Sequence, residues 1–277
     1  MTAIRKNLIF TITHGRTGTT MLTEVFRLFD NIRSEHEPQP NYADVLPYVK
    51  ANPRYAIQFL EKKIGVINMI QEDNYIETSN VFGKGFFIPL IRMGVFPKLV
   101  FLNREFREVA QSLYKRGSFP ARTKIGRHYS ADPSFAGTLP IFQPSHLSDY
   151  QVCFWGVLDS FWRQQSAAAI YDKEGKKYIW ASATDFNDFE RTLEIGEYLG
   201  LFVRDKEEAE FYHRRETNKH HNANSQTAGV SRGHIDFDGE EKEVIDRVAF
   251  YDPIFVDSVL ESRYVSKTLV NAVSSQN

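Results

Sequence analysis

Cysteine is almost absent from this chain of 277 residues, which contains only Cys153. A single cysteine excludes an internal disulfide and any cysteine-based metal cluster, and it suits a reducing compartment. Long apolar runs are absent as well, because no stretch approaches the roughly 18 apolar residues of a membrane-spanning helix. The first apolar run, at 8–10, is too short for a secretory signal. We therefore expect a cytoplasmic protein without a membrane partner.

Net charge is also nearly absent. Lys and Arg total 34 and Asp and Glu total 35, which gives a formal charge of −1. This balance disfavours a general nucleic-acid-binding protein, which is usually markedly basic, and a disordered acidic chain. The charge is unevenly spread, because the stretch from Lys98 to His128 carries 8 Lys or Arg and 2 Glu. A concentrated cationic site for one small, highly charged ligand therefore fits the composition.

Apolar, strand-like runs alternate with helical patterns along the chain. The clearest buried strand is 98–103, and a helix follows it at once. This alternation predicts an α/β fold in which helices flank a central, mainly parallel β-sheet, in a three-layer arrangement like that of P-loop proteins. The predicted strands are 7–13, 32–35, 75–79, 98–103 and 177–183, and the predicted helices are 21–29, 42–49, 54–71, 86–93, 105–115, 149–171, 189–199, 241–250 and 253–262.

Two stretches lack this periodicity. Residues 117–148 contain four prolines together with cationic and aromatic side chains, and a loop this long inside a domain is usually a lid or a binding loop. We expect it to form the lid or acceptor-binding loop of a single domain that covers 1–277. The polar stretch 208–239 has no predicted element.

The turn between the first strand and the first helix has the composition of an anion site. It reads His-Gly-Arg-Thr-Gly-Thr-Thr over 14–20. Gly15 and Gly18 allow a tight bend and a close approach to a ligand, and the following helix presents unpaired N–H groups and a positive dipole end. Arg16 adds a bidentate cation. Three threonines add hydroxyl donors: Thr17, Thr19 and Thr20.

The same turn differs from the P-loop of nucleotide triphosphatases, G-x-x-x-x-G-K-[ST]. Its glycines are three residues apart, no lysine follows the second, and no strand ends in an obvious magnesium-binding aspartate. A phosphoryl-transfer enzyme built around Mg²⁺, such as a nucleotide kinase or hydrolase, is therefore disfavoured. It stays open as an alternative, beside a non-catalytic nucleotide-binding protein. Taken alone, the turn could also be an ordinary connection between a strand and a helix.

A second cationic motif follows the strand at 98–103. Arg104 lies at the carboxyl end of this predicted parallel strand, where the ligands of such sheets gather. Ser112 comes eight residues later, about two helical turns on, so we expect it on the same face as Arg104. The two side chains could hold a phosphate between them, unless Arg104 is simply a surface arginine.

Together, the two motifs resemble those of the sulfotransferases that use 3′-phosphoadenosine 5′-phosphosulfate (PAPS). In that family [KR]-[ST]-G-[ST]-[ST] binds the 5′-phosphosulfate and R-x-x-R-x-x-x-x-S binds the 3′-phosphate. Residues 16–20 match the first motif, and Arg104, Arg107 and Ser112 match the second in order and spacing. The resemblance covers 7–115. It implies PAPS as sulfuryl donor, adenosine 3′,5′-bisphosphate (PAP) as product, in-line transfer without a metal, and Arg16 as the group that neutralises the transferring charge.

The resemblance also indicates which group removes the proton of the acceptor. The segment Ser-Glu-His-Glu-Pro at 34–38 is similar to the acidic segment of the branch that includes bacterial and protein-tyrosine sulfotransferases, which places its catalytic glutamate at the position of Glu37. His36 is the rival base, because imidazole titrates near neutral pH. The third alternative is a solvated loop in which neither Glu37 nor His36 has a catalytic role. Lys84 is a candidate second cation near the sulfuryl group.

The sequence leaves the acceptor open. The resemblance implies a hydroxyl or an amine as the attacking group, and the size of the chain favours a soluble small molecule as acceptor. A sugar, a small alcohol or amine, and a tyrosyl peptide are the alternatives. Asn218–His221 is similar to the loop that closes over the nucleotide in the family. The sequence makes no prediction about the oligomeric state.

Overall fold

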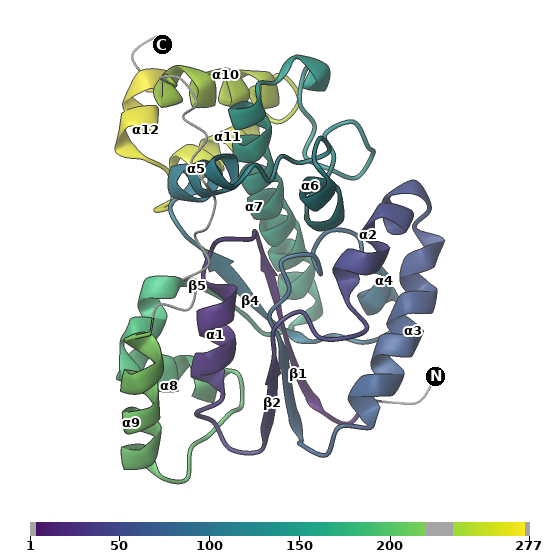
Figure 1. Cartoon of the computed structure of the whole chain (residues 1–277), viewed down its shortest axis with the longest axis vertical. Helices are drawn as coiled ribbons and strands as arrows, with labels where there is room; N and C mark the ends of the chain where they lie inside the picture. The colour runs from purple at the N-terminus through teal and green to yellow at the C-terminus, as the bar shows by residue number, and fades with distance from the viewer. Residues whose placement is uncertain (1–3, 220–234, 275–277) are drawn as a thin grey trace.

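The central sheet has five strands in the part of the chain that the structure describes, and all neighbouring strands are parallel. The structure is a computed structural model that describes residues 4–219 and 235–274 (Figure 1). The strand order is β2-β3-β1-β4-β5. The strands are β1 Asn7–Thr13, β2 Ile32–Glu35, β3 Asn74–Glu77, β4 Lys98–Asn103 and β5 Tyr178–Ser182. The predicted α/β fold with a parallel sheet is confirmed.

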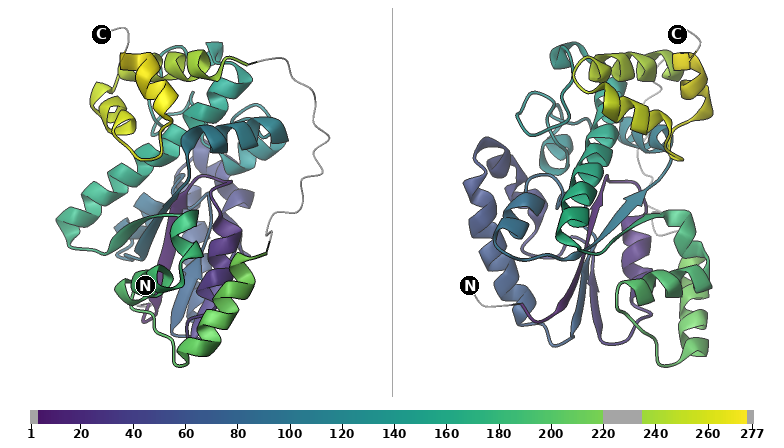
Figure 2. Two further views of the ribbon diagram at one scale, coloured as in Figure 1. Left: turned by 90° about the vertical axis from the view of Figure 1, so that its left-hand side faces the viewer. Right: turned by 180° about the vertical axis from the view of Figure 1, so that it is seen from behind.

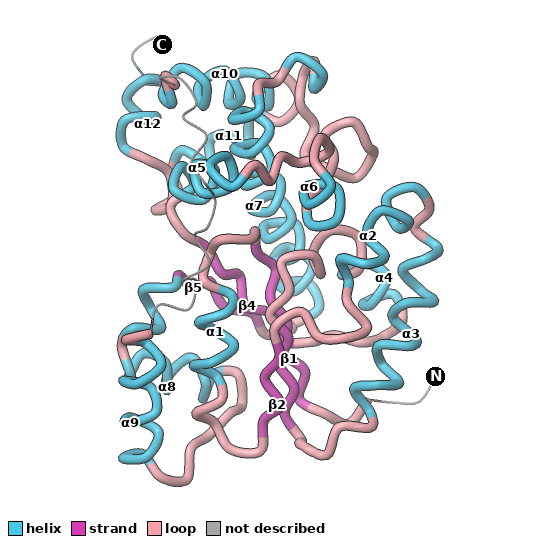
Figure 3. The backbone as a smooth tube through the Cα atoms, viewed as in Figure 1, coloured by secondary structure: helices cyan, strands magenta, loops and turns pink. Residues whose placement is uncertain are grey.

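Helices lie on both sides of the sheet, which gives the predicted three layers (Figure 3). Helices α1 and α8 pack on one face, and α9 packs against α1. The other face is covered by α2, α3, α4 and the C-terminal half of α7. The bounds of these helices are α1 Thr19–Phe26, α2 Tyr42–Ala51, α3 Arg54–Asn68, α4 Phe87–Arg92, α7 Asp149–Glu174, α8 Phe189–Tyr198 and α9 Lys206–Thr217.

Strand β1 shows why the sheet has an apolar core on each face. Successive side chains of a strand point to opposite faces. Phe10 and Ile12 therefore pack among α2, α3 and α4, whereas Ile9 packs among α1 and α8. Both faces of β1 are buried, which explains why its sequence is a nearly continuous apolar run. Its polar last residue, Thr13, leads directly into the turn at 14–20.

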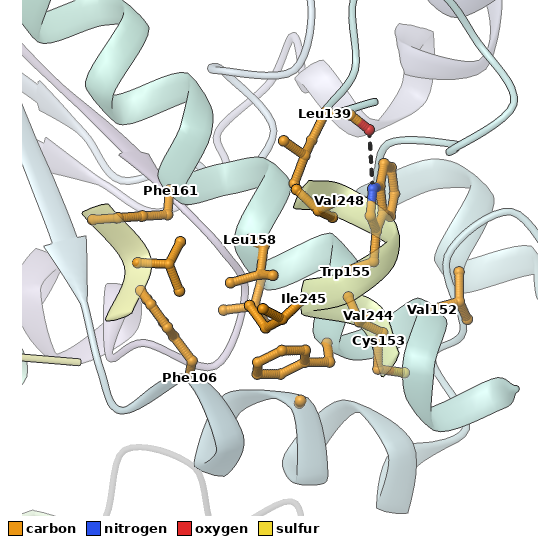
Figure 4. Packing of buried hydrophobic residues seen from close by; sticks show 14 of the residues in the cluster. Phe106, Leu139, Val152, Cys153, Trp155, Leu158, Phe161, Val244, Ile245 and Val248 are labelled. Carbon is orange, nitrogen blue, oxygen red and sulfur yellow. Dashed lines mark hydrogen bonds between the residues drawn. The ribbon is translucent and has the colours of Figure 1, made fainter. Parts of the chain in front are cut away.

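A third core lies beyond the carboxyl end of the sheet (Figure 4). There the N-terminal half of α7 packs against α5 and the C-terminal helices, and Trp155 and Phe161 of α7 are buried among them. Trp162, one heptad further along α7, is partly buried and packs against the same core. The bounds of these helices are α5 Phe106–Arg116, α10 Phe237–Ala249, α11 Pro253–Leu260 and α12 Lys267–Ser274.

The segment 117–148 is less irregular than its sequence indicates. It contains helix α6, Lys124–Tyr129, and a short 3₁₀ helix, Pro144–His146. Leu139 is fully buried in the third core, where its carbonyl oxygen accepts a hydrogen bond of 3.1 Å from the indole nitrogen of Trp155 (Figure 4). Its backbone nitrogen donates to Asp159 at 2.9 Å. These contacts come from α7, so no local periodicity could have predicted them.

Helix α9 is the main element that the sequence pattern misses. It begins at Lys206, just before the polar stretch 208–239, and ends within that stretch. Only Ala209, His213 and Glu216 are buried in it. A helix with so few apolar side chains gives no periodic signal. The local signal is its cap: the Asp205 side chain accepts hydrogen bonds of 3.0 Å from the backbone nitrogens of Glu207 and Glu208.

Arg107 ties α5 to the C-terminal helices. Its Nε lies 3.0 Å from Glu241 Oε1 and its Nη2 lies 2.7 Å from Glu241 Oε2, and it also donates to Asp238 and Thr268. The Glu241 side chain is fully buried. Arg107, which matches the second arginine of the predicted 3′-phosphate motif, is therefore occupied by contacts within the protein.

We expect Arg107→Met to lower the free energy of unfolding by about 3–5 kcal/mol, because it leaves the Glu241 carboxylate buried and unpaired. Urea denaturation followed by circular dichroism measures this. Arg214→Met is the matched control, because Arg214 pairs with Glu210 on the surface of α9 and such pairs contribute at most ~0.5 kcal/mol. Equal small losses in both variants would contradict the assigned role of Arg107.

Candidate functional site

The candidate site lies where all five parallel strands end. The turn at 14–20 follows β1, His36 follows β2, and Asn80 follows β3 within three residues. Arg104 follows β4, and Ala183 follows β5. Because parallel strands share a direction, these segments meet at one edge of the sheet, the usual place for ligands in such folds.

Two adjoining cavities open at this edge. The first, called here the Glu37 cavity, has a volume of about 440 Å³ and is lined by the turn, His36, Glu37, Asn80 and residues from 113–130. The second, called here the Arg104 cavity, has a volume of about 540 Å³ and is lined by the turn, 103–105, 182–184 and the pair Arg263 and Tyr264. Arg16 and Gly18 line both cavities, so the turn forms the wall between them.

The backbone of the turn requires its glycine at position 18. Gly18 has a φ of 102°, and a β-carbon there would lie 3.0 Å from Cβ of Ala183. Gly18 is also the N-cap of α1, and no side chain caps the helix. Inside the turn, the Thr17 hydroxyl donates to the His14 carbonyl oxygen at 2.9 Å. The first N–H groups of α1 therefore face the cavities without a side-chain partner.

Ser112 holds the side chain of Arg16. Arg16 Nε donates to Ser112 Oγ at 3.0 Å. We expected Ser112 to lie beside Arg104, but Arg104 Nε instead donates to Glu108 at 2.6 Å. Arg104 precedes α5 and is not part of it, so a spacing of two helical turns does not place the two residues on one face. Arg104 lines its own cavity, and Ser112 acts at the wall between the two.

Three guanidinium groups lie near one another at this wall. Burial, followed by the charges of Arg116 and Arg104, lowers the pKa of Arg16. Arg116 lines the Glu37 cavity and makes no hydrogen bond or ion pair with any described residue. Arg104 is paired with Glu108, but neither Arg16 nor Arg116 has a carboxylate partner among the described residues. Like charges brought together without a counter-charge favour the binding of an anion. The turn therefore has both the cationic and the backbone features of an anion site.

Glu37 lines the same cavity as Arg16 and Arg116. Its backbone is left-handed, with a φ of 49°, and Asn80 Nδ2 donates to Glu37 Oε1 at 3.1 Å. Burial raises the pKa of the Glu37 carboxyl, although the charges of His36 and Lys84 oppose the shift. A carboxylate with a raised pKa is a stronger base than an exposed one.

His36 lines the same cavity, and its orientation is fixed. Its Nδ1 lies 2.9 Å from the carbonyl oxygen of Thr78, and since a carbonyl only accepts, Nδ1 carries the proton and donates it. The Nε2 of a neutral His36 is then left as an acceptor. Both predicted bases are therefore present in one cavity.

Lys84 lies behind the wall of the Glu37 cavity and not in its lining. Its side chain is only 4% exposed, and Nζ donates to the carbonyl oxygen of Tyr129 at 2.8 Å. Burial lowers the pKa of Lys84 to about 7, although the Asp159 carboxylate acts in the opposite direction. Lys84 is close enough to influence the pKa of both Glu37 and His14.

Several lining residues carried no role in the sequence prediction. His14 is buried, its Nδ1 donates to the Gly15 carbonyl oxygen at 3.0 Å, and burial, followed by the charge of Lys84, lowers its pKa to about 3. His14 is therefore a neutral imidazole. Tyr129 of α6 interacts with the Glu37 carboxylate. Arg263 and Tyr264 reach the Arg104 cavity from the end of the chain, and no pattern near them signals this.

Five buried polar atoms lack a hydrogen-bond partner among the described residues and belong to side chains that line the two cavities. They are His14 Nε2, Asn80 Oδ1, Ser118 Oγ, Asn103 Nδ2 and Glu105 Oε1. Buried polar groups are nearly always paired, so a cluster of unpaired ones at one sheet edge indicates a site that takes a polar ligand.

Comparison with known proteins identifies no family: neither models of known protein families nor the curated proteins match the chain.

Within 4–219 and 235–274, no three His, Cys, Asp or Glu side chains gather as metal ligands. No helix of these residues is long and apolar enough to cross a membrane. Of the predicted nucleotide-closing loop at 218–221, His220 and His221 lie outside the described residues.

We expect Lys84→Met to raise the free energy of unfolding at pH 7. A lysine whose pKa is 10.5 in the unfolded chain and about 7 in the folded protein opposes folding most at pH 7 and below, and this penalty vanishes as the pH rises to 10.5. At 1.36 kcal/mol per pKa unit, the gain at pH 7 is about 3 kcal/mol after the lost Tyr129 contact is counted.

Urea denaturation of both proteins at pH 7 and pH 9.5 tests this, and the difference should shrink at the higher pH. Lys173→Met, on an exposed lysine of α7, should show no such pH dependence. A loss of stability at pH 7 that persists at pH 9.5 would mean that the Lys84 charge does not oppose folding.

Proposed function

We propose that this protein is a sulfotransferase that moves a sulfuryl group from PAPS to a hydroxyl or amine of a small acceptor. The observation that carries the proposal is the arrangement of the two cavities around Arg16. The Arg104 cavity provides space for the nucleotide, and the Glu37 cavity provides a base for the acceptor. Arg16 lies between them, where the transferring group has to be.

The residues of the Arg104 cavity fit an anionic nucleotide. PAPS carries a phosphosulfate and a separate phosphate. The uncapped start of α1 and Gly18 suit the phosphosulfate, and Thr19 and Thr20, which line the Glu37 cavity, add hydroxyls from the other side of the turn. Arg104 would hold the other phosphate, and Arg263 lies near enough to share in this. The unpaired Asn103 Nδ2 is a further donor in the same cavity.

When bound, PAPS supplies the sulfuryl group and a phosphate leaving group. Arg16 would stabilise the negative charge that develops between the two cavities, because its guanidinium keeps its charge and is held in place by Ser112. Arg116 would add a second positive charge on the acceptor side. Neither guanidinium is a good proton donor, so their contribution is electrostatic.

Glu37 would accept the proton of the attacking hydroxyl or amine. Its raised pKa increases its basicity, and the hydrogen bond from Asn80 fixes the carboxylate in the cavity. His36 remains the alternative base, with Nε2 as the accepting atom. Two adjacent groups able to take a proton suit an acceptor that loses one during attack.

The size and lining of the Glu37 cavity favour a small, polar acceptor. Its volume of about 440 Å³ is at the low end for ligand pockets. Leu113 and Ile125 are its aliphatic side chains and Tyr129 its aromatic one, while the other lining residues are polar, charged or glycine. Ile125, Tyr129 and Ser130 come from the segment 117–148, which supports the expected role of this segment in binding the acceptor.

We expect PAP to raise the melting temperature of the protein without added metal. At a hundredfold excess over the dissociation constant, binding stabilises the folded state by ~2.7 kcal/mol. Arg104→Gln should weaken this effect, and Arg214→Met, at a residue that lines neither cavity, should leave it unchanged. No shift with PAP but a clear shift with ATP and Mg²⁺ would instead support a nucleotide kinase or hydrolase.

We expect Glu37→Gln to lower sulfuryl transfer by about 10²–10⁴-fold and to leave PAP affinity unchanged, because the base acts in transfer and not in nucleotide binding. Transfer from PAPS to a broad acceptor panel, read by mass spectrometry, measures this. Glu35→Gln, two residues away and paired with Arg33, is the control. Full activity in Glu37→Gln would move the role of base to His36, and PAP binding without transfer to any acceptor would indicate a non-catalytic nucleotide-binding protein.

A further inference from the structure

A buried ion pair lies directly below the segment that carries Glu37. Lys63 of α3 and Glu77 of β3 are 2% and 1% exposed, and Lys63 Nζ lies 2.8 Å from Glu77 Oε1. Tyr75 donates a hydrogen bond of 2.7 Å to the other oxygen of Glu77. Neither charged residue lines the Glu37 cavity, so neither can touch a ligand in it.

Lys63 bonds to the Glu37 segment as well as to Glu77. Its Nζ donates to the carbonyl oxygen of Pro40 at 2.8 Å and to that of Pro38 at 3.2 Å. The ammonium thus makes one ion pair, with Glu77, and two hydrogen bonds, to these carbonyl oxygens. Both hydrogen bonds hold the backbone just after Glu37.

The segment needs such contacts because its backbone is strained. Glu37 has a φ of 49°, and a residue other than glycine keeps a left-handed backbone only where its surroundings enforce it. Asn41 Nδ2 donates to the Glu37 carbonyl oxygen at 3.0 Å. With Lys63, side chains bond to the carbonyl oxygens of three residues: Glu37, Pro38 and Pro40.

We propose that Lys63, neutralised by Glu77, is a positioning residue that fixes the backbone of 37–40 and thereby keeps the Glu37 carboxylate in its cavity. A lysine in a core requires a counter-charge, and Glu77 supplies it. The ammonium then acts on Glu37 through backbone carbonyls alone. The consequence for catalysis rests on the proposed function, whereas the effect on the Glu37 carboxylate does not.

The test replaces the pair without leaving a buried charge. Lys63→Met alone leaves the Glu77 carboxylate buried without a counter-charge, and this variant could fail to fold. The main variant is therefore Lys63→Met combined with Glu77→Gln, in which the Tyr75 hydroxyl keeps an acceptor. Lys6→Met is the matched control, because Lys6 Nζ also donates to two backbone carbonyl oxygens, those of Ile70 and Glu72, at 2.6 and 2.7 Å.

The first readout is the titration of the Glu37 carboxyl, followed by NMR of carbon-13-labelled glutamate and assigned with Glu37→Gln. The groups that face this carboxyl are His36, Lys84, Tyr129 and Asn80, and all are retained. We expect the pKa of Glu37 to fall towards its ordinary value in the double variant, since the released segment exposes it. It should stay unchanged in Lys6→Met. An unchanged titration in a folded double variant overturns the proposal.

The second readout is kinetic. We expect kcat to fall at least tenfold in the double variant, with the KM for PAPS and the affinity for PAP unchanged, because the turn and the Arg104 cavity do not contact Lys63. Loss of PAP affinity in step with kcat would indicate a general structural role and overturn the proposal. If the unaltered protein transfers no sulfuryl group, the proposed function fails, and the titration still decides the role of Lys63.

Discussion

The left-handed bend between β1 and α1 is the constraint around which the site is built. It requires a residue without a side chain at Gly18, where even a β-carbon would crowd Ala183. The bend turns the uncapped start of α1 towards the cavities and brings Arg16 against Ser112 of α5. Because β1 is the middle strand of the sheet, the bend has a neighbouring strand end on either side, and this is why one cavity lies on each side of it.

Charged groups are buried in two different ways in this fold. Arg107 with Glu241, and Lys63 with Glu77, form ion pairs whose carboxylates are buried. Near the Glu37 cavity, by contrast, burial lowers the pKa of Lys84 and of His14, and it raises that of Glu37. The first arrangement connects helices and strands. The second opposes folding, and a protein keeps such groups where ligand binding or catalysis requires them.

The sequence predicts well what depends on neighbours along the chain. The apolar runs identify the strands, and because parallel strands end at one edge, the turn at 14–20 and the segment with Glu37 could be expected to meet. Contacts between distant segments could not be predicted. Ser112 forms its hydrogen bond with Arg16. The expectation that it shares a helix face with Arg104 fails because α5 begins only at Phe106. Arg263 reaches the Arg104 cavity through the packing of the C-terminal helices, for which the local sequence has no signal.

Helix α7 belongs to two cores at once. Residues from Tyr150 to Phe161 pack in the core beyond the sheet, and Ala167, Ala168 and Tyr171 pack under the sheet (Figure 2). Within the first of these stretches, a β-carbon on Gly156 would lie 3.5 Å from His14 Nε2, so the same helix also passes the turn. An uninterrupted helix has a fixed rise per residue. It therefore sets the separation of the two cores and keeps the turn at a fixed height between the sheet and the C-terminal helices.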